Sequence, residues 1–468
     1  MLHPLQVEWD ADLRGGDPLE WPGYADTLAE AAHGDSIVTG RAVVDGERTE
    51  GRYVVMAGRF ECLGGSMGVV HGERVVRAYR RATIERLPVV IISASGGARL
   101  QEGMVALLQL ARTAAAARAH ARSGLLSVAV LRAPTTGGVL ASYVSLADVR
   151  AAQPGATIGF AGPRVVEVMT GSAPPVHSHT AESAHMAGLV DALVAPTDQA
   201  PWVEAALGLR DMPLPPRPLP ASVPDTAANG ANDVASAWRL VLRARARSRP
   251  SGIDQAARLS QSWVELRGSD PAVRAGLARI GGRRVVVVAN DRHSARGRPG
   301  PGGYQLAQRA IALAGRLGLP LLTLVDTPGA EPGPASEAGG VAGEVARTFA
   351  AMAELPTPSV SVCVGEGGSG GALALAAADR MLMCEHAIFS VIGPEGAAAI
   401  LQRDIEAAPD MARQLRLGSS DLLALGIIDA VVPDDGPELA AAVGLALDEA
   451  EAGDRALRLD RASARWLK

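Results

Sequence analysis

Glycines gather in VGEGGSGGALALAAADR (residues 364–380), where an apolar run gives way to an alanine-rich one. A G-x-G-x-x-G spacing that starts at Gly365, with Glu385 about 20 residues on, is typical of a dinucleotide-binding turn. A G-x-S-x-G spacing centred on Ser369 is typical of a hydrolase nucleophile elbow. Because 53 of the 468 residues are glycine, against a usual share of about 7%, such spacings also arise by chance.

An internal repeat supplies the context for these glycines. The first half reads PVVIISASGGARLQEG and then LLSVAVLRAPTTGGVLASYVSLADV, and the second reads PLLTLVDTPGAEPG and then SVSVCVGEGGSGGALALAAADRM. Three landmark pairs hold offsets between 231 and 233 residues: Gly97 with Gly329, Gly137 with Gly370, and Gly162 with Gly393. A nearly constant offset over this length indicates that one fold has been duplicated.

The repeat argues against both familiar spacings. A dinucleotide-binding turn is the first strand-to-helix turn of its domain, but another such turn already precedes it at 327–330. A hydrolase of the usual order needs an aspartate and then a histidine after Ser369, and Asp379 and His386 follow very closely. The aligned residue of the first half is Thr136, which is no better as an elbow nucleophile. We interpret both matches as coincidence.

What recurs is a pair of glycine turns about 40 residues apart in each half, each joining a buried strand to a helix. Backbone N–H groups at the start of a helix lack partners and are backed by the helix dipole. Glycine lets a substrate oxygen come close to them, and two converging amides form an oxyanion hole. The alternative is that these glycines only allow helix and strand to pack closely.

Composition narrows the class of protein. The formal net charge of −5 leaves no basic footprint for a nucleic acid. The three cysteines form no C-x-x-C pair, so we expect neither disulfides nor a zinc ribbon, and place Cys363 and Cys384 in the core. The start of the chain does not read as a signal peptide, and no apolar run reaches the length of a membrane span. We expect a soluble cytoplasmic protein that binds neither nucleic acid nor membrane.

The domain boundary follows from the proline content. Residues 212–233 carry six prolines between Pro213 and Pro224 and then small polar residues, which favours an extended connector. The prediction is therefore a first domain at 1–211, a linker at 212–233 and a second domain at 234–468.

The repeated motifs resemble a known family. SASGGARLQEGMVALLQLARTAAA, PTTGGVLASYVSLADV and IGFAGPRVV look like the beta subunit of bacterial acetyl-CoA carboxylase carboxyltransferase, and DTPGAEPGPASEAGGVAGEVAR, GEGGSGGALALAAADR and FSVIGPEGAAAIL look like its alpha subunit. The resemblance covers most of 15–205 and 235–435 and suggests a beta–alpha fusion. It implies an α/β fold of tandem crotonase-like domains, each a superhelix of ββα units.

The resemblance also implies a chemistry without a conspicuous side-chain base. Carboxyl would move from carboxybiotin, on a separate carrier protein, to the α-carbon of an acyl-CoA thioester, and the enolate and the biotin ureido oxygen would both need stabilising. By resemblance, two pairs hold these oxygens: Gly137 and Gly138 for the thioester, Gly371 and Ala372 for biotin. The neighbouring turns would be shaped by Gly97, Ala98, Gly329, Ala330 and Gly370.

The implied product is malonyl-CoA from acetyl-CoA, made with a separate biotin carboxylase and biotin carboxyl carrier protein in an ATP-dependent complex of fatty acid biosynthesis. We expect at least a homodimer in which the acyl-CoA half of one protomer meets the biotin half of another. Alternatives are a propionyl-CoA or specialised acyl carboxyltransferase, a malonyl decarboxylase, or a non-catalytic scaffold. Two departures stand out: the family's four-cysteine zinc ribbon is missing, and Gly339 replaces a frequent arginine.

Other polar residues receive structural interpretations. We expect Glu102 and Gln101 to cap the helix that follows them, with proton donation as the alternative. His177 and His179 lie in a loop without a nearby third metal ligand. The arginine run at 239–249 is interpreted as a solvated helix face, with contact to CoA phosphates or an acidic carrier domain as the alternative. The C-terminal run ELAAAVGLALDEAEAGDRALRLDRASARW predicts a terminal packing helix.

Overall fold

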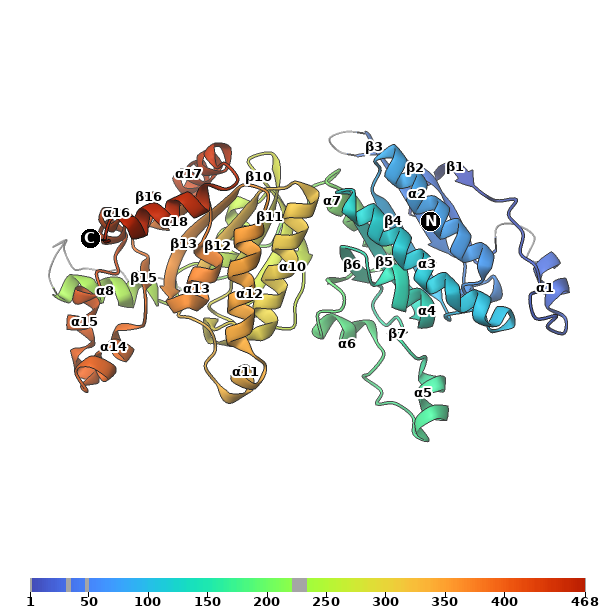
Figure 1. Ribbon diagram of the computed structural model, residues 1–468, viewed down its shortest axis with the longest axis horizontal. Coiled ribbons are helices and arrows are strands. Elements are labelled where there is room, and N and C mark those ends of the chain that lie inside the picture. Colours follow the sequence, from blue (N-terminus) through green and yellow to red (C-terminus); the bar gives the residue numbers. More distant parts are fainter. Residues whose placement is uncertain (1, 31–34, 47–49, 221–233, 468) are drawn as a thin grey trace. The chain divides into compact units, whose positions relative to one another are not determined.

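A computed structural model describes residues 2–30, 35–46, 50–220 and 234–467. The chain divides into two compact units, Met1–Asp211 (unit 1) and Met212–Lys468 (unit 2). Figure 1 shows that each unit consists of a sheet with helices laid against it. Each unit therefore has the alternating strand–helix architecture that the repeat predicts.

The sheet of unit 1 has eight described strands. Their order is β1 (Leu5–Trp9), β2 (Ile37–Asp45), β3 (Glu50–Gly58), β4 (Val89–Ser95), β5 (Ser127–Thr136), β6 (Val149–Ala152) and β8 (Ala192–Leu193), with β7 (Ile158–Gly159) paired to β5. Pairing is antiparallel from β1 to β3 and parallel from β3 onward. All seven residues of β4 are buried, as expected for a parallel strand covered on both faces.

Two long helices, α2 (Val69–Glu85) and α3 (Gly103–Arg122), pack against each other in unit 1 (Figure 1). The shorter helices are α1 (Tyr24–Glu30), α4 (Gly137–Val139), α5 (Pro163–Thr170), α6 (Ala181–Met186) and α7 (Gln199–Leu207). Helix α4 continues as a π-helical segment, Leu140–Val144, which leads back into the core. The turn before α4 is thus connected, through the π-helical segment, to the hydrophobic core of unit 1.

The sheet of unit 2 repeats this order in the described residues. It runs β9 (Ser262–Leu266), β10 (Val273–Ile280), β11 (Arg283–Asn290), β12 (Leu321–Thr327), β13 (Ser359–Gly368), β14 (Arg380–Cys384) and β16 (Ala430–Val432), with β15 (Ile388–Ser390) paired to β13. Strands β9 to β11 are antiparallel and the remainder are parallel.

The helices of unit 2 include α8 (Val234–Ala244), α9 (Gly252–Leu259), α10 (Pro301–Leu317), α11 (Pro334–Ala338), α12 (Val341–Glu354), α13 (Ser369–Ala376), α14 (Pro394–Leu401), α15 (Ala408–Gln414), α16 (Ser419–Leu425), α17 (Gly436–Glu449) and α18 (Asp454–Ala464). Helix α10 starts with a proline and ends at Gly318 in the left-handed region, the common pair of start and stop signals. It packs against α12 as α2 packs against α3.

The duplication is confirmed, and the structure corrects its register by one residue. Ser95 pairs with Thr135 in unit 1, and Thr327 pairs with Gly367 in unit 2, so both sides of the pairing are offset by 232 residues. Gly137 therefore corresponds to Ser369, not to Gly370. Both have positive φ, 59° and 61°. The alignment missed this because serine stands where the first half has glycine.

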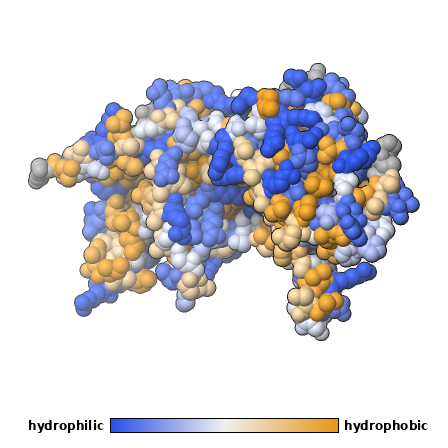
Figure 2. All heavy atoms as spheres, turned by 45° about the vertical axis from the view of Figure 1, so that its right-hand side comes forward, coloured by the Kyte–Doolittle hydropathy of each residue, from blue (hydrophilic) through white to orange (hydrophobic). Residues whose placement is uncertain are grey.

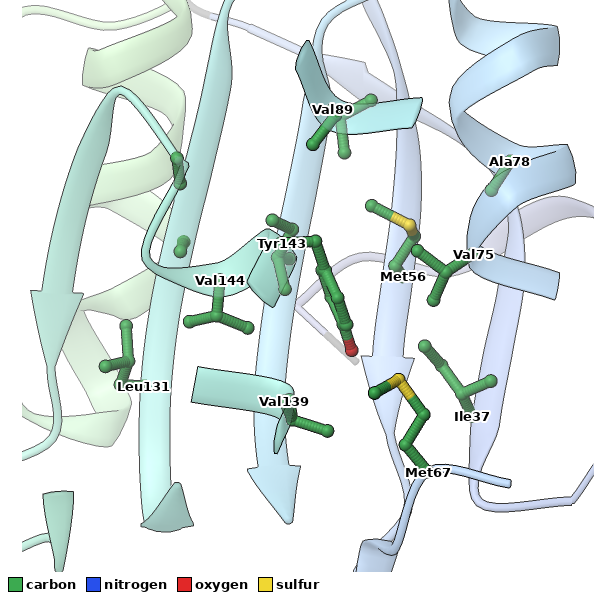
Figure 3. Close-up of a cluster of buried hydrophobic side chains, with 14 of the residues drawn as sticks. Ile37, Met56, Met67, Val75, Ala78, Val89, Leu131, Val139, Tyr143 and Val144 are labelled. Atoms are coloured by element: carbon green, nitrogen blue, oxygen red, sulfur yellow. The ribbon is translucent and has the colours of Figure 1, made fainter. Parts of the chain in front are cut away.

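Tyr143 belongs to the π-helical segment, and its side chain is part of the hydrophobic core of unit 1. In Figure 3 its ring points toward Met67 and lies beside Met56, whereas Val144 lies on the side of Leu131. The segment after Gly138 is thus held from two sides by buried apolar side chains, which favours a fixed geometry at the preceding turn.

Two stretches differ from the sequence prediction. The proline-rich segment is not free at its start: Met212 hydrogen-bonds β9, and Arg217 pairs with Asp254 and Asp291, so this part belongs to unit 2. Residues 221–233 of the predicted linker lie outside the described residues. The predicted single C-terminal helix is two helices, α17 and α18, because Gly453 with φ of 100° ends the run between them.

Candidate functional site

The two glycine turns of unit 1 lie against each other. Gly97 has φ of 116° and Gly137 has φ of 59°, backbone conformations that side chains rarely adopt. A β-carbon on Gly137 would stand 2.8 Å from the Cα of Gly97, and one on Gly97 would stand 3.5 Å from the amide nitrogen of Gly138. The structure therefore brings together the predicted residues of both turns in this unit.

The backbone N–H groups of these turns are not all available. The N–H of Gly137 donates to the carbonyl of Phe160 at 2.9 Å, and the N–H of Gly97 donates to Ser95 Oγ. Among the described residues, the N–H groups of Ala98 and Gly138 have no hydrogen-bond partner. The amide pair that can receive an oxygen is therefore one from each turn. The Gly137 amide, which the sequence prediction paired with that of Gly138, is already engaged in this structure.

Unit 2 builds the same arrangement from Gly329 and the start of α13. Gly329 has φ of 120°, close to that of Gly97, and its N–H donates to Thr327 Oγ1. A β-carbon on Gly368 would stand 2.2 Å from the carbonyl oxygen of Pro328, so the two turns are in backbone contact. A β-carbon on Gly371 would stand 2.6 Å from the amide nitrogen of Ala330. Glycine is required at these positions because backbone fills the space.

In the described part of unit 2, the N–H groups of Ala330, Gly370 and Gly371 have no hydrogen-bond partner. Ala372 is the fourth residue of α13, where the backbone N–H is the first that a helix pairs internally. The Ala372 amide is thus a poorer donor than the sequence prediction assumed. Beside Gly371, the buried hydroxyl of Tyr304 also has no partner among the described atoms.

A buried ion-pair network holds the first turn of unit 1 in place. The Arg99 side chain, fully buried, contacts the carboxylates of Asp35 and Glu102. Burial alone would raise the pKa of Asp35, but hydrogen bonds and charge from Arg99 lower it. Because Arg99 follows Ala98 directly, this network positions the Ala98 amide. Sequence reasoning missed the contact between Arg99 and Asp35, because these residues lie 64 positions apart in the chain.

Glu102 caps a different helix from the one predicted. Its carboxylate accepts from the backbone N–H of Val69, the first residue of α2, at 2.6 Å, and from the hydroxyl of Tyr24 at 2.6 Å. A carboxylate at a helix N-terminus is favoured by the helix dipole. The expectation that Glu102 caps α3 is wrong because the chain after Gly97 folds back toward α2.

A buried histidine supports the second turn. His71 contacts Tyr143 Oη at 3.0 Å and Ser36 Oγ at 2.8 Å, and is almost fully buried. Burial lowers the pKa of His71 to about 3, so the ring is neutral at ordinary pH. These contacts connect α2, and the residue just before β2, to the segment that follows Gly138.

The arginine run at 239–249 is only partly solvated. Arg249 donates to the fully buried carboxylate of Asp326 at 2.7 Å, and Arg245 pairs with Glu366 and Glu395. The interpretation as a solvated face is therefore wrong for these two side chains. The run does not continue as one helix, because α8 ends at Ala244. Through their ion pairs with Asp326 of β12 and Glu366 of β13, Arg249 and Arg245 instead hold the segment after α8 against the ends of these two strands.

The remaining candidate residues have structural positions away from the glycine turns. Cys363 and Cys384 are buried, as predicted, and burial raises the pKa of the Cys363 thiol to about 12. His179 contacts the hydroxyl of Ser178. Across the described ranges no group of three or more His, Cys, Asp or Glu side chains is arranged to hold a metal. No described helix is long and apolar enough to cross a membrane.

Comparison with known proteins agrees with the two units. A family model for carboxyl transferase domains matches residues 22–237, and one for acetyl co-enzyme A carboxylase carboxyltransferase-like proteins matches residues 226–443. The acetyl-coenzyme A carboxylase carboxyl transferase subunits beta/alpha of Salinispora tropica is 44% identical over 450 residues, covering 90% of this chain and 77% of that protein. A probable biotin-dependent acyl-coenzyme A carboxylase beta3 subunit of Mycobacterium tuberculosis is 40% identical, covering 92% of this chain and 86% of the relative.

A solved structure of transcarboxylase 12S has a TM-score of 0.77 at 24% identity, covering 94% of this chain and 86% of its own. The fold likeness agrees with two crotonase-like units, and the two family models define the chain as a carboxyltransferase. The 44% identity to the Salinispora protein, over most of both chains, identifies the family within this class. The chain belongs to the family of carboxyltransferases of biotin-dependent acyl-CoA carboxylases.

Proposed function

We propose that this chain transfers a carboxyl group from carboxybiotin, held on a separate carrier protein, to acetyl-CoA, giving malonyl-CoA. The observation that carries the proposal is the pair of turns in each unit, each of which leaves at least one backbone N–H without a partner among the described residues. Such donors, fixed before the substrate arrives, are suited to hold an oxygen on which negative charge develops. The name of the Salinispora relative supports acetyl-CoA as the acyl substrate.

In unit 1, the amides of Ala98 and Gly138 would receive the thioester oxygen as the enolate forms. Gly137 and Gly97 would shape this hole, because any side chain on either would collide with the other turn. This keeps the predicted turn but moves one donor from Gly137 to Ala98. The hydrogen bond from Gly137 to Phe160 then has a structural role: it fixes the start of α4.

In unit 2, the amides of Ala330, Gly370 and Gly371 would receive the carbonyl oxygen of biotin. The fit is supported by Gly371, since a β-carbon there would displace the Ala330 backbone. When bound, carboxybiotin supplies the carboxyl group and the basic nitrogen that takes the α-proton of the thioester. The chain itself would orient both substrates and stabilise charge, with Gly329 and Ala372 shaping the turn and the helix.

The proposed partners are a biotin carboxylase and a biotin carboxyl carrier protein in an ATP-dependent complex of the cytoplasm. We propose that unit 1, residues 1–211, binds acyl-CoA and that unit 2, residues 212–468, binds biotin, without a zinc ion. A homodimer or higher homo-oligomer is supported by exposed apolar side chains on two equivalent helices. Helix α5, the projecting segment of unit 1 in Figure 1 that is coloured hydrophobic in Figure 2, exposes Val168 and Met169, and α14 exposes Ile400 and Leu401.

Separate chains test that architecture. Residues 1–211 and 212–468 made apart should each be inactive and should regain activity when mixed. A Gly138→Val chain mixed with a Gly371→Val chain should also recover part of the activity after subunit exchange, because one shared site of the hybrid dimer is then intact. If the two variants are shown to exchange subunits and the mixture stays inactive, the whole site lies within one chain.

Propionyl-CoA or a specialised acyl-CoA is the second candidate substrate, supported by the acyl-coenzyme A carboxylase name of the Mycobacterium relative. A malonyl decarboxylase or a scaffold would use the same fold. The intact turns in both units speak against the scaffold, which needs no free amides.

The reverse reaction tests the proposed function with the isolated protein. Malonyl-CoA or methylmalonyl-CoA is supplied with free biotin, and release of acetyl-CoA or propionyl-CoA is followed. In this direction the bond from the α-carbon to the carboxyl breaks, a bond from that carboxyl to biotin N1 forms, and the N1 proton goes to the α-carbon. The proposal expects turnover that depends on biotin. Equal turnover without biotin would instead identify a decarboxylase.

A further inference from the structure

The two units differ at the residues that directly precede their glycine turns. With the offset of 232 residues, Asp326 and Glu366 of unit 2 correspond to Ala94 and Pro134 of unit 1. The side chains of Asp326 and Glu366 are almost fully buried. Because a buried carboxylate is costly unless a positive charge is paired with it, these positions set unit 2 apart from unit 1.

Arg245 holds one of these carboxylates together with a second one from α14. Its guanidinium donates to Glu366 from Nε at 3.0 and 3.1 Å and from Nη2 at 2.8 Å, and to Glu395 from Nη1 at 2.6 Å. Glu395 lies in the first turn of α14. Burial alone would lower the pKa of Arg245, but hydrogen bonds and charge from both carboxylates raise it. One side chain thus connects α14 to the end of β13.

The turn that follows Glu366 is rich in glycine. Five of the seven residues 365–371 are glycine, which loses more conformational freedom on ordering than any other residue. The corresponding residues of unit 1, 133–139, include two glycines and also Pro134, whose ring restricts the backbone. The turn of unit 2 has no proline at this position, and the ion pair of Glu366 with Arg245 is placed to anchor it instead.

We propose that Arg245 is a positioning residue for the biotin reaction: its ion pairs with Glu366 and Glu395 hold the second turn of unit 2 at the spacing that the hole requires. This inference rests on the proposed function, because it takes the amides at the start of α13 as donors to biotin. Arg245 acts through Glu366. The backbone N–H of Glu366 also donates to Asp326 Oδ1 at 3.1 Å, which joins the second turn to the strand that carries the first.

Replacing Arg245 by methionine removes the charge and keeps a long side chain. With malonyl-CoA and free biotin, kcat/KM for biotin should fall by about 10²-fold, the usual cost of a displacement of about 1 Å, and KM for malonyl-CoA should stay within about twofold. The KM is spared because the acyl-CoA is assigned to unit 1. The matched control is Arg247→Met, which removes an exposed arginine from the same segment and should keep both constants.

A double variant distinguishes positioning from a general loss of stability. Arg245→Met leaves the buried Glu366 carboxylate without its ion-pair partner, and losing one member of a buried pair costs more than losing both. Adding Glu366→Gln to Arg245→Met should therefore restore kcat/KM for biotin by about tenfold. A residue with a merely structural role gives no such recovery in a variant that lacks two charged groups.

Glu395→Gln tests the link to α14 alone, since it keeps the pair of Arg245 with Glu366. Glu395 is partly exposed, so this variant is expected to fold even where Arg245→Met does not. It should lower kcat/KM for biotin by about fivefold, the upper end of the effect of a partly exposed ion pair. Thermal midpoints establish that each variant is folded.

The outcomes separate the two claims. No biotin-dependent turnover of malonyl-CoA by the wild-type chain would overturn the proposed function itself. With an active wild-type chain, three results would overturn the positioning role and leave the proposed function standing: a folded Arg245→Met protein with unchanged kcat/KM for biotin, a double variant no better than Arg245→Met, or an equal loss in Arg247→Met. A Glu395→Gln protein with wild-type constants would overturn the part assigned to α14.

Discussion

Replacing Gly371 by alanine tests the hole of unit 2 with a single methyl group. The added β-carbon would stand 2.6 Å from the amide nitrogen of Ala330 and 2.6 Å from the hydroxyl of Tyr304. Ordinary contact begins at 3.4 Å, so the Ala330 turn and α13 must move apart by about 0.8 Å. A displacement of about 1 Å between groups that act together can cost about 10²-fold in rate.

We therefore expect Gly371→Ala to lower biotin-dependent turnover of malonyl-CoA by about 10² to 10³, the usual effect of losing one oxyanion donor. The loss should lie in kcat, with the KM for malonyl-CoA nearly unchanged, because the acyl-CoA is assigned to unit 1. Overpacking should also lower the free energy of unfolding by about 1–3 kcal/mol.

The matched control is Gly444→Ala. Gly444 lies within α17, and a β-carbon there would meet nothing within 4 Å. Alanine in a helix interior is favoured over glycine by about 1 kcal/mol, so this variant should be fully active and slightly more stable. A Gly371→Ala protein that keeps more than a tenth of the wild-type kcat would refute the reasoning, because the Ala330 amide would then not matter.

Three further predictions concern single side chains. Ser369→Ala should keep activity within tenfold, since only its backbone is used; a loss beyond about a hundredfold in the same assay would restore the nucleophile hypothesis. His71 stays neutral when folded, whereas the unfolded chain takes up a proton below about pH 6.5, so stability should fall as pH falls, by about 2 kcal/mol from pH 7 to 5. Denaturant titrations of His71→Gln should show a flatter dependence, and an unchanged slope would contradict the assigned pKa. Arg249→Ala should cost about 3 kcal/mol of unfolding free energy, because the buried Asp326 carboxylate would keep only the longer ion pair with Arg292 at 3.4 Å. Exposed Arg247→Ala should stay within about 0.5 kcal/mol, and equal losses would show that the Arg249 ion pair is unimportant.

The sequence was sufficient to predict the duplication and the turns, because buried strands, glycines and helix-like runs are local signals. Gly97 and Gly329 indeed adopt nearly the same backbone conformation. The one-residue error at Gly370 arose because Ser369 takes the left-handed conformation that its counterpart Gly137 takes, which a glycine pattern does not reveal.

Which amides are free could not be predicted. The Gly137 amide is engaged because β7 pairs beside β5 and brings the Phe160 carbonyl to it, a contact set by tertiary structure. The same reason applies to Arg99 and Asp35, which lie 64 residues apart in the sequence. Local patterns locate turns, whereas long-range pairing decides which of their groups remain available.

The most direct test of backbone catalysis removes one amide hydrogen at a time. Lactic acid in place of Ala98, or of Ala330, turns the amide into an ester and deletes the N–H while keeping the methyl side chain. The same exchange at Ala173, an exposed loop residue, is the control. We predict that each of the two esters lowers biotin-dependent kcat by about 10² to 10³ and that the control changes nothing. Folded Ala98 and Ala330 esters that keep kcat within tenfold of wild type would contradict the account.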